Sequence, residues 1–160
     1  MPSFIRRVRT ASLRMAVAAA LLAAIAACGE TAGGLAPGLV ASMDAPGASL
    51  DRATALSLIN QFRRTTGAGT LADDASLDAQ AQSLAQTYSK TGKPPGLPAG
   101  ITGLRASAGY PTFAETFSGW RNSPADAAVL GDPKAQRAGL AAVYDANSAY
   151  GVYWILVLGG

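Results

Sequence analysis

The chain has 160 residues and a formal net charge of +3, and it contains one cysteine and no histidine. The lack of imidazole excludes a Ser-His-Asp or Cys-His catalytic apparatus and a histidine-ligated zinc site. A single cysteine also excludes a disulfide within one chain, so packing alone has to hold the fold together.

The first segment, residues 1–27, has the pattern of a secretory signal peptide. Four arginines lie within its first 14 residues, and an uncharged stretch rich in Ala and Leu, residues 15–27, follows them. A basic start before a short apolar stretch is typical of such signals, and this stretch is shorter than the about 20 residues that span a bilayer. Its removal leaves nine basic and ten acidic side chains, hence a net charge of −1. The apparent basicity therefore gives no support for nucleic-acid binding.

The end of this segment, Ile25-Ala26-Ala27-Cys28, resembles the bacterial lipobox. That resemblance implies cleavage before Cys28 and a diacylglyceryl thioether on its sulfur. An ordinary signal that happens to contain a cysteine is the alternative, and the Arg6-Arg7 pair leaves a twin-arginine export route open. Glycine after Cys28, rather than aspartate, resembles lipoproteins that are passed on to an outer membrane. We therefore expect a protein of the cell envelope that faces the periplasm or exterior and is held to a membrane by lipid on Cys28.

The next segment, residues 28–48, is rich in Gly, Ala, Pro and Ser and has no helical or strand period. This composition predicts the lipidated cysteine followed by a flexible linker. The remaining residues, 49–160, are enough for a single core of ordinary size. We therefore expect one domain there.

Two helices are predicted in the first half of this domain. Ser49 is a good N-cap for the first helix, and Gly67 ends it. The second helix is capped from Asp73 or Asp74 and runs to about Thr91. Each helix carries an apolar stripe that faces a core: Ala55, Leu58, Ile59 and Phe62 in the first, and Leu77, Ala81, Leu84, Ala85 and Tyr88 in the second.

The middle of the domain is predicted as a loop, a short strand and two helices. Residues 92–103 are dense in Pro and Gly and predict a loop, with an extended piece around 101–106. Thr112 and Glu115 form a T-x-x-E capping box that opens the third helix. Ser123 and Pro124 then start a short fourth helix and place Asp126 at its third position. There we expect Asp126 to complete a helix cap by accepting from the backbone N–H of the capping residue.

The end of the chain predicts a β-hairpin. Residues 138–144 and 152–158 are strand-like, and a polar turn at 145–148 separates them. The second strand is apolar at every position, which is typical of a strand covered on both faces. Helices first and a buried antiparallel hairpin last predict an α+β sandwich.

Three groups of residues resemble the CAP superfamily, the cysteine-rich secretory protein, antigen 5 and pathogenesis-related group, in its short bacterial form (SCP-like domain). The first group follows the family's N-x-x-R-x-x-x-G-x-x-x-L-x-x-D-x-x-L-x-x-x-A-x-x-x-A spacing, with eight matches over 26 residues. The second is similar to W-x-x-S-P and the third to the closing Y-W-x-x-V-x-G strand. The matched residues are Asn60, Arg63, Gly67, Leu71, Asp74, Leu77, Ala81 and Ala85; Trp120, Asn122, Ser123 and Pro124; and Tyr153, Trp154, Val157 and Gly159.

The resemblance implies a three-layer α-β-α sandwich around an antiparallel sheet, with the C-terminal hairpin between helices. Many members line a groove with two histidines and two glutamates, and some bind a divalent metal there. In this chain one histidine position is taken by Asp126, and the segment of the other is residues 89–98. A glutamate position falls near residues 103–105, where the chain has Leu104. We therefore expect no metal, no other cofactor and no catalytic residue.

Most of the matched residues are expected to serve the fold. Arg63 can reach a carboxylate or carbonyl across the first two helices, and Asp74 caps the second helix. The same role is expected of Asn60, Trp120, Ser123, Pro124 and Trp154.

Three functions remain open. The favoured one is a non-catalytic module that binds a hydrophobic or envelope ligand, peptidoglycan or a protein, with Glu115, Asp126, Trp120 and Tyr88 as groove candidates. The aromatic residues of the second and third helices could line an apolar pocket for a lipid, or they could be core. A second possibility is a degenerate cell-wall hydrolase that uses Glu115 and Asp126 as paired carboxylates. The third is a scaffold that only displays a surface.

Overall fold

The computed structural model of the chain describes residues 34–160, so the predicted signal peptide and Cys28 lie outside the described residues. None of the helices described is long and apolar enough to cross a bilayer. The elements are α2 (Pro37–Val40), α3 (Arg52–Thr65), β1 (Ala72–Asp73), α4 (Ala75–Thr91), β2 (Gly103–Ala108), α5 (Phe113–Asn122), α6 (Pro124–Leu130), β3 (Arg137–Tyr144) and β4 (Val152–Gly159).

The four strands form one sheet in the order β1-β3-β4-β2. The β3–β4 and β2–β4 pairs are antiparallel, as predicted, whereas the short β1 pairs with β3 in parallel. All eight residues of β4 are buried, which confirms that this strand is covered on both faces. The short strand β1 lies at one edge of the sheet, and β2 lies at the other edge.

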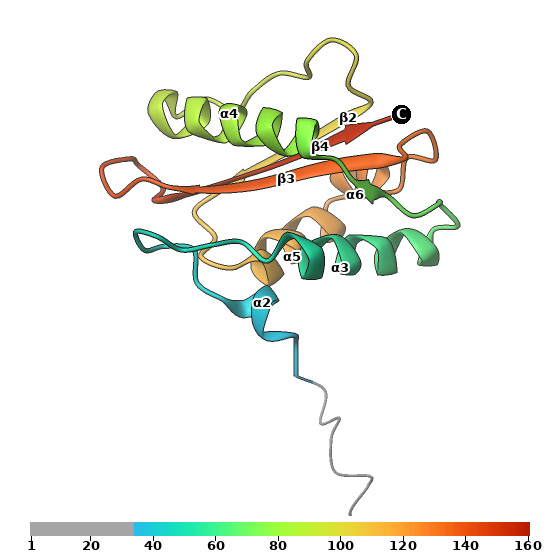
Figure 1. Ribbon diagram of the computed structural model, residues 1–160, viewed down its shortest axis with the longest axis horizontal. Helices are drawn as coiled ribbons and strands as arrows, with labels where there is room; N and C mark the ends of the chain where they lie inside the picture. The colour runs from blue at the N-terminus through green and yellow to red at the C-terminus, as the bar shows by residue number, and fades with distance from the viewer. Residues whose placement is uncertain (1–33) are drawn as a thin grey trace, which may run out of the picture. The chain divides into compact units, whose positions relative to one another are not determined.

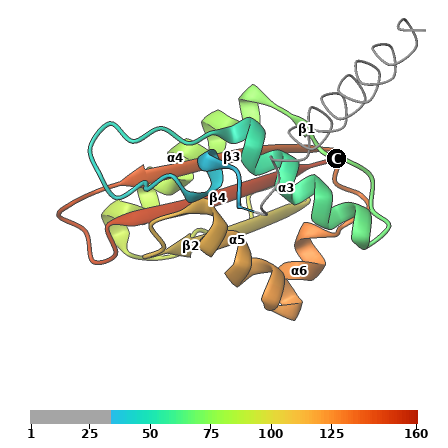
Figure 2. The same cartoon turned by 90° about the horizontal axis from the view of Figure 1, so that it is seen from below.

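Helices cover both faces of the sheet. Figure 1 shows α4 on one face and α2, α3 and α5 on the other, and Figure 2 shows α3, α5 and α6 together from below. Two separate apolar clusters fill the two interlayer spaces, one built around Phe113, Phe117 and Trp154 and the other around Ala81, Ala85 and Tyr153. The predicted three-layer α-β-α sandwich is therefore confirmed.

The predicted helix caps are largely confirmed. Asp74 caps α4, and Gly92 ends it with a left-handed φ of 64°. The capping box of α5 is complete, because Thr112 Oγ1 accepts from Glu115 N and the Glu115 carboxylate accepts from Thr112 N. The first predicted cap was wrong: α3 is capped by Asp51, whose carboxylate accepts from Thr54 N (3.0 Å) and Thr54 Oγ1 (2.7 Å). Asp51 thus offers two bonds where Ser49 would offer one.

The segment predicted as a flexible linker up to residue 48 is folded in its second half. Leu39, in the short helix α2, and Met43 are both buried in the cluster that lies between α3, α5 and the sheet. Met43 N also donates to Pro111 O (2.8 Å). The packed unit therefore begins at residue 36 rather than 49, because two apolar side chains in a Gly- and Pro-rich stretch are enough to fasten it.

Helix α4 lies close against β3 at Gly139. A Cβ atom at this position would stand 2.0 Å from the carbonyl carbon of Leu77 and 2.2 Å from Asp78 N. The Asp78 carboxylate, one turn into the helix, accepts from Leu140 N (2.9 Å). A glycine is thus required where the helix backbone meets the strand backbone.

Candidate ligand groove along strand β2

A groove of about 330 Å³ runs along the first half of β2. One wall is the loop before the strand, with Pro94, Pro95 and Leu97, and the other includes Val129 of α6. Residues 102–106 form its floor. Most of this lining is apolar or small, and Arg105 is its one charged residue.

Arg105 is held by two partners. Its Nη1 donates to the carboxylate of Asp126 on α6, and its Nε donates to the neighbouring Leu104 carbonyl oxygen. Both charged side chains are about a quarter exposed, at 26% and 28%. The ion pair fixes the guanidinium beside the groove at a modest gain in stability, because solvent screens a pair this exposed.

The predicted hydrogen bond from the capping N–H to the Asp126 carboxylate was wrong, whereas the predicted place of Asp126 in the first turn of α6 is confirmed. Ser123 Oγ does cap α6 by accepting from Asp126 N (3.5 Å), with Pro124 at the first helical position. The backbone N–H of Ser123, however, donates to Gly119 O of the preceding helix (3.2 Å). That donor is already used, and the Asp126 carboxylate turns to Arg105 instead, where it gains a charged partner.

The groove brings together the three segments that the family resemblance assigned to it. Residues 89–98 contribute Pro94, Pro95 and Leu97; residues 103–105 contribute the floor; and α6, which carries Asp126, contributes Val129. In the structure this groove is lined by Pro94, Pro95, Leu97 and Leu104 among others, and Asp126 binds the lining residue Arg105 from α6.

Glu115, the other carboxylate proposed for the groove, is occupied in the α5 cap. Its Oε2 accepts from Thr112 Oγ1 (2.8 Å) and from Thr112 N (3.2 Å), and Glu115 is exposed to solvent. Asp126 is bound to Arg105 on a different helix. Each carboxylate thus has a structural partner of its own, and among the described residues the two carboxylates share no hydrogen-bonding partner.

The aromatic groove candidates lie in the core. Trp120 is 2% exposed and packs edge-on against Phe113, with ring centroids 6.3 Å apart. Its Nε1 has no hydrogen-bond partner among the described residues. Tyr88 belongs to the other cluster, 4.9 Å from Tyr153, and burial raises the pKa of its hydroxyl. These rings fill space on opposite faces of the sheet, so they do not line one pocket.

Arg63 is the most thoroughly satisfied polar side chain of the core. It is fully buried and donates to four backbone carbonyls: Gly69 O (2.6 Å), Leu130 O (2.6 Å), Asp132 O (3.1 Å) and Ala135 O (3.0 Å). Desolvation lowers the pKa of this guanidinium, and the charge of Asp132 acts against that shift. The predicted fold role of Arg63 takes the form of a clamp that fastens two loops to α3.

Two other matched residues also bind backbone groups. Asn60 donates to Leu71 O (3.0 Å) and accepts from Leu71 N (2.8 Å), which fixes the chain just before β1. Trp154 of β4 donates through Nε1 to Tyr110 O (2.8 Å), beyond the end of β2. Both residues therefore hold loops rather than a ligand.

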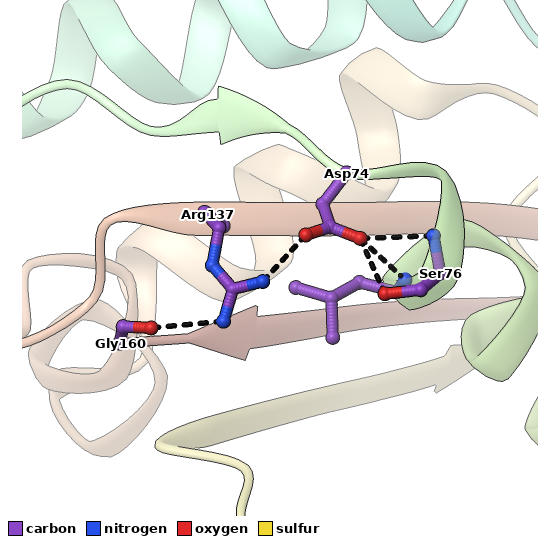
Figure 3. A network of polar contacts seen from close by, with 5 residues as sticks. Asp74, Ser76, Arg137 and Gly160 are labelled. Atoms are coloured by element: carbon purple, nitrogen blue, oxygen red, sulfur yellow. Dashed lines mark hydrogen bonds and ion pairs between the residues drawn. The ribbon is translucent and has the colours of Figure 1, made fainter.

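Asp74 joins the cap of α4 to the end of the chain. One carboxylate oxygen accepts from Ser76 Oγ (2.5 Å), Ser76 N (2.8 Å) and Leu77 N (3.1 Å). The other accepts from Arg137 Nη1 (2.6 Å), whose Nη2 donates to Gly160 O (2.9 Å) (Figure 3). The Ser76 hydroxyl, the Leu77 amide and Arg137 together lower the pKa of Asp74 to about 2.

Sequence reasoning did not single out Arg105, Leu97 or Val129 as site residues. A signal was present for Arg105, because it is a lone basic residue in a strand of small side chains. Its partner on α6 is 21 residues away, and only the folded chain shows that the two meet. Among residues 34–160, no group of three or more His, Cys, Asp or Glu side chains is placed to hold a metal ion.

The pattern of one protein family, described as CAP: Cysteine-rich secretory protein family, matches residues 56–158. That match spans more than half of the chain and includes α4, the groove and the hairpin. The chain belongs to the CAP family. No curated protein matches it.

Three solved structures resemble this CAP domain at 12–17% identity, and each match covers 68% of the chain. An outer surface protein from Borrelia burgdorferi aligns with a TM-score of 0.56, 14% identity and 92% of its own chain covered. An extracellular protein containing an SCP domain from Bacillus anthracis aligns with a TM-score of 0.56 and 17% identity, and 40% of its own chain is covered. A cysteine-rich secretory protein from Staphylococcus aureus aligns with a TM-score of 0.52 and 12% identity, and 38% of its own chain is covered. At such identities the likeness shows the fold.

Proposed function

We propose that this CAP domain is an envelope-anchored binding module that takes its ligand in the groove along β2 and does not turn it over. The observation that carries the proposal is the groove itself, which three separate segments of the chain line together and whose lining is apolar or small apart from Thr102 and Arg105. Proton transfer near neutral pH needs a group such as imidazole or a carboxylate with a raised pKa. The groove supplies an arginine and a carboxylate bound to it.

The lining favours a ligand with both apolar and polar groups. Leu97 is 60% exposed at the wall of the groove, so it presents apolar surface to the solvent. Arg105 offers a positive charge nearby. A hydrophobic or envelope ligand or a protein segment fits this combination, and a buried lipid pocket fits less well because the core aromatic rings already fill the interior.

The lipid on Cys28 supplies the anchor in this proposal. Two or more acyl chains hold a protein stably at a membrane. Because the packed unit begins at residue 36, seven residues, 29–35, connect it to Cys28. Such a connector spans about 25 Å at most, so the domain would work close to the membrane surface.

The anchor is tested by the mass and partition of the mature chain. We expect a chain that begins at Cys28 and carries a diacylglyceryl group, and that enters the detergent phase of a phase-separating extract. The Cys28→Ser variant should lack the added mass and stay in the aqueous phase. A wild-type chain that is cleaved elsewhere, or that lacks lipid, would contradict the anchor.

Groove binding is tested with a single reporter. Leu97→Cys gives the lipidated protein one free thiol at the groove, and an environment-sensitive dye on it is titrated with palmitate, with peptide-free glycan strands and with a random peptide pool. We expect a saturable change with at least one probe and none for the same dye on Asn147→Cys, in the hairpin turn. A flat response to all three probes would refute groove binding.

The two alternatives rest on weaker ground. A hydrolase built on Glu115 and Asp126 needs carboxylates free for acid and base roles, whereas each is engaged in a cap or an ion pair. It predicts that Glu115→Ala or Asp126→Ala abolishes muropeptide release by a folded protein. A display scaffold predicts no response of the groove reporter.

A further inference from the structure

We propose that the ligand of this groove is an extended peptide that carries a carboxylate and adds a strand to the free edge of β2. This inference rests on the proposed function, since it names the ligand class of the same site. Three observations carry it: the unpaired edge, the form of the neighbouring loop, and the charge of the groove.

The edge of β2 offers main-chain hydrogen-bonding groups. Gly109 N donates to Val152 O (2.9 Å), and Ala108 lies opposite Tyr153. Because antiparallel pairing alternates along a strand, the N–H and C=O groups of Ala106 and Ala108 point away from β4. In the described part of the chain, none of these four groups has a hydrogen-bond partner. Such an edge is a template for another strand.

The loop beside β2 leaves this edge available. It contains Pro94, Pro95 and Pro98, which have no N–H with which to complete a ladder. Its one backbone bond within residues 92–101 is internal, from Ile101 N to Pro98 O (3.3 Å). The loop therefore forms a wall of the groove without pairing with the strand. A guest strand would place alternate side chains against that wall, where Leu97 is exposed.

An unused donor of the groove's one charged residue, Arg105, favours an acidic guest. Arg105 is the one charged residue of the lining, and a guanidinium has five N–H donors. Nε and Nη1 are used by Leu104 O and Asp126, whereas Nη2 has no hydrogen bond among the described residues. A guest carboxylate can therefore accept from Nη2 without displacing Asp126. An ammonium group at the same place has no lone pair with which to accept from Nη2.

Selection from a displayed library of random octapeptides tests this proposal. The bait is the mature lipidated protein in nanodiscs, and the matched baits are Ala106→Pro, which removes an outward N–H, and Ala106→Ser, which keeps it. Proline is tolerated at an edge position whose N–H faces solvent. We expect peptides with Asp or Glu to be enriched on wild type and Ala106→Ser, and to bind Ala106→Pro at least about tenfold more weakly, as expected for lost hydrogen bonds.

A second measurement does not depend on the folding of Ala106→Pro. Methylation of alternate amide nitrogens of a selected peptide should abolish binding in one register and leave it within about twofold in the other. Replacing the acidic residue of the peptide by Gln should weaken binding to wild type and have no further effect on Arg105→Gln.

Three results would overturn the proposal: no enrichment over empty nanodiscs, enrichment of peptides without carboxylates, or equal binding by both methylated forms. These results are separate from failure of the proposed function. If the dye at position 97 responds to palmitate or glycan while no peptide is enriched, groove binding stands and the peptide proposal fails. If no peptide is enriched and the dye responds to none of its probes, both groove binding and the peptide proposal fail.

Discussion

At the scale of single residues, the buried side chain of Arg63 makes the largest set of hydrogen bonds in the described part of this CAP domain. Its guanidinium satisfies carbonyls at Gly69, Leu130, Asp132 and Ala135, of which the last three lie 67 to 72 residues away in the chain. A buried acceptor left without a partner costs about 1–3 kcal/mol. The sequence pattern marked Arg63, but the four acceptors are backbone carbonyls, one at the end of α6 and three in loops, that no side-chain pattern could identify.

Replacing Arg63 by alanine should lower the free energy of unfolding by at least about 3 kcal/mol, because several buried carbonyls lose their donor. Urea denaturation of the two proteins measures the difference. Arg64→Ala, which truncates the exposed neighbour on the same helix, is the control and should change stability by less than about 0.5 kcal/mol. Equal losses for both variants would contradict the clamp.

Asp74 should make stability depend on acid pH. Its pKa in the folded protein, about 2, lies below its ordinary value of 3.8, so the charged form is favoured by folding. The stabilisation is therefore fully present above about pH 4 and is lost as pH falls toward 2. Asp74→Asn removes this contribution. Urea unfolding between pH 2 and pH 6 should show a gap between wild type and Asp74→Asn that narrows below pH 4, and a gap of constant size would count against this assignment.

At the scale of elements, the contact between α4 and β3 depends on Gly139. Gly139→Ala places a methyl group within 2.3 Å of three backbone atoms of Leu77 and Asp78, which no rotamer change can relieve. We expect a loss of about 3 kcal/mol or more as the helix is pushed off the sheet. Chemical denaturation measures it, with Gly69→Ala as a control that meets no atom within 4 Å. A stable Gly139→Ala protein would show that α4 is not fixed at this point.

Local chemistry explains which elements could be predicted. The cap formed by Thr112 and Glu115 and the apolar strand β4 depend on residues that are neighbours in the sequence. Both predictions are confirmed. The parallel pairing of β1 and the burial of Leu39 and Met43 depend on contacts with distant elements. By residue type, Ser49 and Asp51 are both good N-caps. Only the reach of the Asp51 carboxylate to Thr54 in the folded chain decides between them.

The groove was predictable in position and not in content. Its three segments were assigned through the family resemblance, and the structure brings them together. Asp126 was expected to finish a cap, whereas its carboxylate binds Arg105 across from α6 to β2. The choice between a near backbone donor and a distant charged partner is made by tertiary structure, because Ser123 N is already bound to Gly119 O.

At the scale of the whole molecule, the CAP fold is combined with the groove along β2 and with a predicted lipidation site. The CAP sandwich has two apolar cores, one on each face of the sheet, and loop clamps such as Arg63. The groove has apolar walls and a paired arginine, which suit binding. Under the proposed function, a domain tethered close to a membrane would hold a partner at the cell surface rather than modify it.

Mass spectrometry of potential substrates tests this claim most directly. The mature protein is incubated with peptidoglycan fragments, peptides and simple esters, and every product is compared with the same mixture containing Asp126→Ala and with buffer. We expect unchanged substrate masses in all three mixtures. A product that forms with the wild-type protein and is lost with Asp126→Ala would show that the groove is a catalytic site and would contradict this account.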